Sequence, residues 1–254
     1  MRDVQNEIDY RNVEINKVGV KNLKYPIVLL DKANDKQHTV ASINMYVNLP
    51  HQFRGTHMSR FIEILNKYRR EIDIHNMGNI MKEMKENLNA ESAHLEMEFP
   101  YFIEKSAPVS GAKSLMGYQC KFIGELNHRI KLSLEITIPI LTVCPCSKEI
   151  SDRGAHNQRG IIRVLLQFKG FLWIEDLIEM LEDCASGTVY SLLKREDEKY
   201  VTEKSYDNPR FVEDVVRNVA LKLEKVENIT RYQVEVETCE SIHNHDAYAC
   251  IVKE

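Results

Sequence analysis

The amino-acid sequence predicts an internally duplicated α+β fold, built from antiparallel sheets with helices on one face. An order of two strands, two helices and two strands occurs twice along the 254 residues, without residue-by-residue similarity between the halves. Hydrophobic residues make up 43% of the chain, which is enough for a substantial core. The seven prolines and ten glycines are scattered, so nothing marks a flexible linker and we expect the halves to pack together.

The first half of the chain, residues 1–126 with a polar N-terminal arm, shows this order once. Apolar residues alternate with mostly polar or small ones over 41–49, the period of a half-buried strand. Apolar residues at helical spacing predict two helices further on. The other expected elements are a strand within 18–30, helices over 58–73 and 74–89, and strands over 92–104 and 118–126.

The second half, residues 127–254, repeats the order. We place the beginning of its last helix at Asn208 as the N-cap, with Pro209 in the first helical position. Short sheets of this kind have open edges, which are usually closed by forming a barrel or by oligomerisation. The expected elements are strands over 128–141 and 161–168, helices over 172–184 and 208–226, and strands over 231–240 and 246–254.

Charge and hydropathy exclude several classes of partner. The 34 basic and 38 acidic residues nearly cancel, which argues against nucleic acid or an anionic membrane as the main partner. No apolar run approaches the roughly 20 residues of a membrane span, and the polar start lacks the core of a signal peptide. We therefore expect a cytoplasmic protein, whose six cysteines are reduced and, where clustered, bind metal or take part in chemistry.

The segment TVCPCSKEISDRGAHNQRG, residues 142–160, is the densest group of reactive side chains. Cys144 and Cys146 flank Pro145 at the end of a predicted strand, where a period of two points both thiols to one face. His156 follows on a loop short enough to fold back towards them. Three nearby ligands at this spacing fit an open catalytic metal site better than a closed structural one. A reduced cysteine pair beside a loop histidine explains the spacing equally well.

Further polar groups stand apart from this segment. Residues 194–203 form an acidic run between the predicted helices, and such runs are usually solvated. Glu213 lies off the apolar stripe of its helix, which most often means exposure to solvent. The turn RGTHMSR, residues 54–60, precedes a helix and is suited to an anion such as phosphate. Metal-competent residues also gather near the C-terminus, namely Cys239, Glu240, His243, His245 and Asp246.

Five segments together resemble the type IB GTP cyclohydrolase I family, from about residue 40 to the C-terminus. They are NLPHQFRGTHMSRF, CPCSKEISDRGAHNQRG, LLKREDEKYVTE, NPRFVEDVVR and ESIHNHDA. The resemblance implies the tunnelling fold, in which β-β-α-α-β-β units assemble into barrels. It also implies two such units per chain and a homotetramer with active sites at subunit interfaces.

The resemblance further implies that GTP and water are converted to 7,8-dihydroneopterin triphosphate and formate, the first step towards tetrahydrofolate. Cys144, His156 and Glu198 would be metal ligands, and His243 a fourth ligand or a proton-transfer group. Glu213 would accept hydrogen bonds from the N–H groups of guanine. This ligand set should accept Zn²⁺, Mn²⁺ or Fe²⁺. The candidates for binding the triphosphate are Arg54, Arg60, Lys148 and Arg159.

Two other functions remain open from the sequence. Reductases of deazaguanine nitriles and pterin synthases also have tunnelling-fold barrels with a glutamate that binds the base, and the nitrile reductase needs NADPH and no metal. In a non-enzymatic scaffold, Cys144, Cys146 and His156 would close a structural metal site with one more ligand. Metal removal would unfold such a scaffold, whereas it would only inactivate an enzyme.

Overall fold

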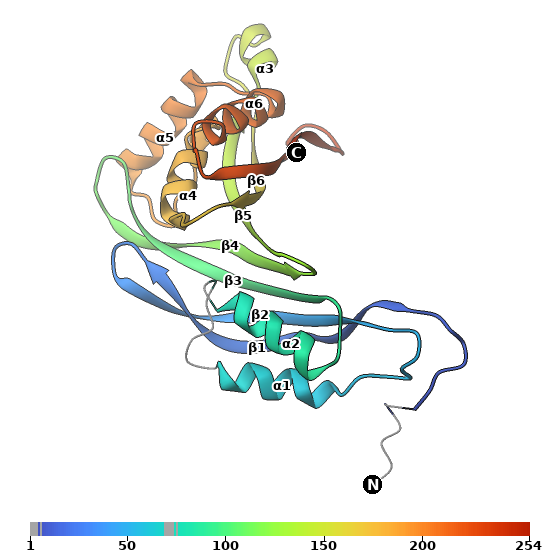
Figure 1. Ribbon diagram of the computed structural model, residues 1–254. Helices are drawn as coiled ribbons and strands as arrows, with labels where there is room; N and C mark the ends of the chain where they lie inside the picture. Colours follow the sequence, from blue (N-terminus) through green and yellow to red (C-terminus); the bar gives the residue numbers. More distant parts are fainter. Residues whose placement is uncertain (1–4, 6, 69–73, 75) are drawn as a thin grey trace. The chain divides into compact units, whose positions relative to one another are not determined.

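The computed structural model describes residues 5, 7–68, 74 and 76–254 (Figure 1). Contacts divide the chain into two compact units, one of Met1–Pro100 with Lys121–Ser133 and one of Tyr101–Cys120 with Leu134–Glu254. No helix among the described residues is long and apolar enough to cross a membrane. The tandem boundary expected at residue 126 stays a prediction.

Nine strands among the described residues form the sheet, with hydrogen-bonded order β1-β2-β3-β4-β5-β6-β8-β9 and β7 paired to β5. The strands β3, β4 and β5 contribute a segment to each unit. The pairs β1 with β2, β2 with β3, β6 with β8, and β8 with β9 are antiparallel, as expected. The strands span Ile15–Asp31, Asp35–Leu49, Ala93–Ser106, Lys113–Leu126, Ile130–Val143, Asn157–Phe168, Gly187–Thr188, Ile229–Cys239 and Asp246–Lys253, from β1 to β9.

In the first unit, α1 (Met58–Lys67) and α2 (Met77–Asn87) lie beside the strands (Figure 1). The alternation predicted for 41–49 is confirmed, since every second residue of that stretch is buried in β2. Gly124 of β4 allows close approach, because a Cβ there would lie 2.8 Å from the Met81 side chain. Residues 69–73 and 75, which complete the two helices expected over 58–73 and 74–89, lie outside the described residues.

In the second unit, the buried face of the sheet packs under two amphipathic helices, α4 (Ile174–Glu182) and α6 (Val212–Leu223). Within β5, which covers most of the strand expected over 128–141, alternate residues from Leu134 to Ile140 are at most 1% exposed, whereas Ile130, which the same alternation places on the buried face, is 41% exposed. Helix α6 contacts β8 and β9, and residues from all three elements line one cavity. The fold is therefore α+β with antiparallel pairing and helical cover, as the sequence predicts.

Two local expectations for this unit are wrong. The acidic run 194–203 is not a connection, because it lies mostly within helix α5 (Arg195–Asp207). The last helix begins at Val212 with Phe211 as its N-cap, rather than at Pro209. Asn208 is engaged elsewhere, since its side-chain amide donates to the carbonyl oxygens of Ala185 and Ser186 at 3.0 and 3.3 Å.

Candidate active site

A cavity of about 310 Å³ opens in the second unit, where the ends of β5 and β8 approach the start of α6. Its walls come from segments far apart in the sequence, because antiparallel strands bring their ends together. Six of the residues singled out in the sequence line this cavity, and they are Cys144, His156, Glu213, Glu240, His243 and His245.

Cys144 directly follows β5 and is the N-cap of a short helix, α3 (Pro145–Ile150). Its Sγ atom accepts a hydrogen bond from the amide of Ser147 at 3.4 Å, and Pro145 occupies the first helical position. Cys146 is exposed and does not line the cavity. The expectation that both thiols share one face of a strand is therefore wrong, because the chain has already turned into a helix.

His156 folds back onto Cys144, as the length of the loop predicts. The amide of Cys144 donates to the carbonyl oxygen of His156 at 3.1 Å. The amide of His156 in turn donates to Ser147 Oγ at 3.2 Å. These two hydrogen bonds close the loop and hold both side chains on the wall of the cavity.

A chain of polar contacts fixes the orientation of the His156 ring. Gln158 Nε2 donates to Glu240 Oε1 at 3.0 Å, and a carboxylate accepts but does not donate when ionised. The amide oxygen of Gln158 therefore faces His156 Nδ1 at 3.0 Å. Because this oxygen only accepts, Nδ1 carries a proton, and in the neutral ring Nε2 then holds the lone pair. That nitrogen is available as a metal ligand or a base.

Glu240 has a role in this site that the sequence does not predict. Its Oε1 atom also accepts from the Thr238 hydroxyl at 2.8 Å, and Oε2 lies 4.0 Å from His156 Nδ1. The Glu240 side chain is only 13% exposed. Its partner Gln158 is 82 positions away in the sequence, so only the folded chain shows what Glu240 does.

The mouth of the cavity is formed by the connection between β8 and β9 and the start of β9. The rings of His243 and His245 stack there, with centroids 4.9 Å apart, and both residues are exposed. Tyr248 lines the same opening. Loss of hydration, together with hydrogen bonding to Cys250 and Glu235, raises the pKa of Tyr248 to about 12. Its phenol therefore stays protonated near neutral pH.

The first turn of α6 supplies the opposite wall. Asp214 accepts a hydrogen bond from the amide of Phe211 at 3.0 Å, which starts the helix so that Glu213 borders the cavity. The Glu213 carboxylate makes no hydrogen bond or ion pair with another described residue. Arg210 is the one Lys or Arg among the described lining residues, and it was not selected from the sequence.

Three predicted residues of this unit do not line the cavity. Glu198 is exposed on the first turn of α5, and Arg159 is exposed on β6. Lys148 donates to the carbonyl oxygen of Tyr206 at the end of α5, and its Nζ lies 4.3 Å from the centre of the Tyr206 ring. Lys148 thus ties α3 to α5.

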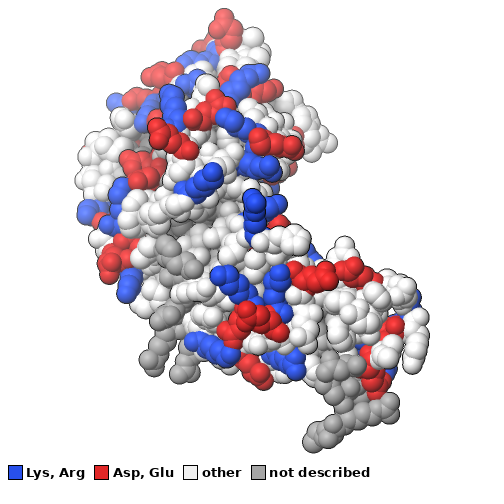
Figure 2. All heavy atoms as spheres, in the orientation of Figure 1, with Lys and Arg blue, Asp and Glu red and all other residues white. Residues whose placement is uncertain are grey.

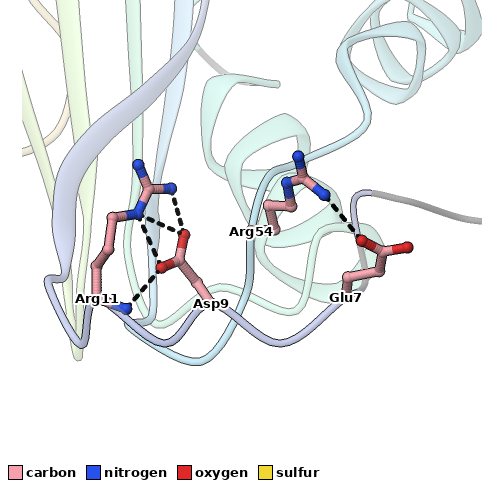
Figure 3. Close-up of polar contacts among 4 residues, drawn as sticks. All are labelled: Glu7, Asp9, Arg11 and Arg54. Atoms are coloured by element: carbon pink, nitrogen blue, oxygen red, sulfur yellow. Dashed lines mark hydrogen bonds and ion pairs between the residues drawn. The ribbon is translucent and has the colours of Figure 1, made fainter.

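Arg54 and Arg60 belong to the first unit and have partners of their own. Arg54 forms an ion pair with Glu7 at 2.8 Å, beside the pair of Arg11 with Asp9 (Figure 3). Arg60 donates to the carbonyl oxygen of Asn87 at 2.7 Å. Cationic and anionic side chains are interspersed over the face drawn in Figure 2, which agrees with the near-zero net charge.

The donor atoms of Cys144 and His156 fit two positions of a divalent-metal site. One offers a sulfur ligand, and the other an imidazole nitrogen whose partner nitrogen is hydrogen-bonded, the arrangement typical of metal-binding histidines. Among the described residues, no three Cys, His, Asp or Glu side chains are gathered closely enough to hold a metal. The ligand set that the resemblance implies stays a prediction.

Solved structures that share this fold include urate oxidases. The enzyme of Bacillus sp. TB-90 matches 94% of this chain and 99% of its own, with a TM-score of 0.57 and 9% identity. The urate oxidase of Bacillus subtilis matches 93% and 98%, with a TM-score of 0.54 and 9% identity. At such identities the likeness establishes the fold alone, and that fold is the tunnelling fold.

The sequence itself matches a family model. Residues 1–249 fit the model described as type I GTP cyclohydrolase folE2, and the chain belongs to that family. A relative from Syntrophus aciditrophicus, named GTP cyclohydrolase FolE2, is 59% identical over 100% of both chains. Relatives of the same name from Syntrophotalea carbinolica and Kosmotoga olearia are 59% and 54% identical, covering 99% and 100% of this chain and 94% and 98% of their own. The predicted membership of the GTP cyclohydrolase I family is thus confirmed.

Proposed function

We infer that this protein is a GTP cyclohydrolase of the type IB form, which converts GTP and water to 7,8-dihydroneopterin triphosphate and formate. The family match and the full-length relatives of that name support the activity. The structural observation that carries the inference is the gathering of Cys144, His156 and Glu213 on the walls of one cavity. We also propose that the enzyme is cytoplasmic and that it acts in folate biosynthesis.

The proposed cofactor is one divalent ion, Zn²⁺, Mn²⁺ or Fe²⁺, held by Cys144 and His156. Support comes from the hydrogen bond at His156 Nδ1, which leaves Nε2 as the nitrogen that can bind a metal, and from the Cys144 thiol on the same wall. Glu198 and His243 are the candidates for the remaining positions. When bound, such an ion supplies a water nucleophile at neutral pH for attack on C8 of guanine.

Base recognition is assigned to Glu213. Its carboxylate is an acceptor without a partner among the described residues, and it borders the cavity. Guanine presents two N–H groups side by side, at N1 and at the exocyclic N2, which one carboxylate can bind together. Adenine has no hydrogen on N1, so it cannot offer the carboxylate this pair of donors.

Proton transfer to the departing nitrogens is assigned to His243, with His245 as its neighbour. Both rings lie at the mouth of the cavity, and histidine changes its charge closest to neutral pH. The triphosphate carries several negative charges and needs cationic partners. The candidates for this role stay those selected from the sequence, which are Arg54, Arg60, Lys148 and Arg159.

The proposed assembly is a homotetramer with active sites at subunit interfaces. Strands β1 and β9 are the edges of the sheet, and β9 exposes Tyr248 and Val252 at 56% and 59%. Cys144 and Glu213 line one cavity of a single chain, whereas Glu198 lies outside that cavity. A neighbouring chain is therefore proposed to provide Glu198.

Subunit mixing tests this assembly. Chains carrying Cys144→Ala and chains carrying Glu198→Ala are each expected to be inactive, and their mixture to regain part of the activity after exchange of subunits is verified. A mixture of Cys144→Ala with Glu213→Ala chains is expected to stay inactive. Absence of recovery in the first mixture would show that Glu198 does not act across an interface.

The activity is tested with purified protein reconstituted with each of the three metals. Incubation with GTP is expected to release formate together with a pterin that becomes fluorescent after oxidation. Metal-depleted protein is the control and is expected to stay folded but inactive, as measured by circular dichroism. Formation of neither product with any of the metals would contradict the proposal, and unfolding on metal removal would favour the structural scaffold.

A further inference from the structure

Two threonines line the cavity and are equally buried, but only one of them has a hydrogen-bond partner. Thr142 and Thr238 are each 1% exposed. The Thr238 hydroxyl donates to Glu240 at 2.8 Å, whereas Thr142 Oγ1 has no partner among the described residues. A buried hydroxyl without a partner destabilises a fold. The Thr142 hydroxyl is therefore suited to a ligand in the cavity.

Packing alone does not require a hydroxyl at this position. Thr142 stands at the end of the apolar row of β5, on the same face as Ile138 and Ile140, both of which are 0% exposed. A valine has nearly the same shape and the same preference for strands, and it would continue the row without an unsatisfied polar atom. The hydroxyl thus costs stability in the ligand-free protein.

A second buried donor lies where the segment before α6 meets the end of β5. The amide of Arg210 donates to the carbonyl oxygen of Val143 at 3.0 Å, which ties the segment before α6 to the end of β5. Arg210 Nε is buried and has no partner among the described residues. Glu213 follows three positions later. Two donors, from Thr142 and Arg210, and one carboxylate acceptor thus border one cavity.

This pattern complements one edge of guanine, so the inference rests on the proposed function. A carboxylate that binds the N–H groups at N1 and N2 leaves the O6 carbonyl oxygen beside it, and O6 requires a donor. We propose that Thr142 is a specificity-determining residue whose hydroxyl donates a hydrogen bond to O6 of guanine. Arg210 Nε offers a second donor to the same oxygen, which has two lone pairs.

The test is calorimetric titration of the metal-depleted full-length protein, which binds nucleotide without turnover. GTP and inosine triphosphate carry O6, whereas 6-thioguanosine triphosphate carries a sulfur, which is a weak acceptor. Thr142→Val is expected to weaken the binding of GTP and of inosine triphosphate about tenfold. Binding of 6-thioguanosine triphosphate should weaken less than about twofold. Thr142→Ser keeps the hydroxyl and should retain the wild-type preference. The matched control is Thr137→Val, on the same strand but outside the cavity.

Thermal unfolding separates ligand binding from a structural role. If Thr142 serves the ligand, Thr142→Val leaves the Tm of the ligand-free protein unchanged or raises it, because a buried unsatisfied hydroxyl is removed. A lower Tm with an equal loss of affinity for all three nucleotides would overturn the proposal. So would an affinity for GTP that stays within about twofold of the wild type.

Turnover of GTP by the metal-reconstituted wild type distinguishes an error in the role of Thr142 from an error in the proposed function. If the wild type releases formate from GTP and Thr142→Val still binds GTP normally, only the role of Thr142 is wrong. If the wild type releases no formate, the proposed function is wrong, and the three titrations still decide whether Thr142 reads O6.

Discussion

The backbone amide of Cys144 donates a hydrogen bond to the carbonyl oxygen of His156, 3.1 Å away. This contact brings a thiol and an imidazole twelve positions apart onto one wall of the cavity. It depends on backbone atoms, so substitution of either side chain leaves the loop closed. Changes at these two positions should therefore affect chemistry more than folding.

Replacement of Cys144 by alanine is expected to lower kcat by more than about 100-fold, because the proposed metal loses its sulfur ligand. Its side chain is only partly buried, so the free energy of unfolding should change by less than about 1 kcal/mol. Metal content, formate release and urea unfolding measure these effects. The control is Cys146→Ala, which changes an exposed thiol outside the cavity. Normal activity and metal content in Cys144→Ala would refute its assignment as a ligand.

Gln158 should act as a positioning residue, since it links His156 to Glu240. Gln158→Met keeps the length of the side chain but removes the acceptor that fixes the proton on His156 Nδ1. We expect metal affinity to fall about 10- to 100-fold, as is typical when the partner of a metal-binding histidine is lost. Titration against a chelator measures this change, with Gln167→Met on the same strand as the control. Unchanged metal affinity would mean that the contacts of Gln158 with His156 and Glu240 do not affect metal binding by His156.

Glu213→Ala should raise KM for GTP and reduce the preference for GTP over ATP. The lost carboxylate is the proposed acceptor for two N–H groups of guanine, and such polar readout separates bases strongly. Comparison of kcat/KM for the two nucleotides measures the effect, with Glu227→Ala as a control at an exposed position outside the cavity. Equal use of GTP and ATP by the wild type would contradict base recognition by Glu213.

A pH-dependent contribution to stability is expected from Asp31, at the turn between β1 and β2. Burial acts to raise the pKa of this carboxyl, but hydrogen bonds from the Asn34 amide and the Gln37 side chain outweigh it and lower the pKa. The stabilisation is therefore complete above the unfolded pKa of about 3.9 and is lost as the pH falls below that value.

The corresponding variant is Asp31→Ala, which should lose about 2 kcal/mol of unfolding free energy at pH 7. This loss should shrink at pH 3, because the carboxyl of the unfolded wild type is then largely protonated and folding must release that proton. Urea unfolding at the two pH values measures it, with the exposed Asp152→Ala as the control. An equal loss at both values would show that the charge of Asp31 does not matter.

Strands and amphipathic helices could be predicted from the sequence because their burial repeats with a fixed period. Helix α5 could not, since only Asp197 and Ser205 of its residues are buried and no apolar stripe marks it. Asp197 instead binds the backbone and side chain of Ser110 with its carboxylate, a long-range contact without a periodic signal.

The candidate site could be predicted only in part. Cys144 and His156 lie close in sequence, so a short loop suffices to bring them together. The role of Glu240 depends on Gln158, and that of Arg210 on the end of β5, and neither relationship follows from spacing along the chain. Cys146 was wrongly predicted to share a face with Cys144. The prediction continued the period of a strand past Cys144, but helix α3 begins at Pro145.

The most direct test of the central claim follows C8 of guanine. GTP labelled with ¹³C at C8 is incubated with the metal-reconstituted protein, and the products are followed by ¹³C NMR. The account predicts that the label appears in formate, that a pterin forms in equal amount, and that Cys144→Ala yields neither. Label retained in an intact purine, or formate released equally by Cys144→Ala, would contradict it.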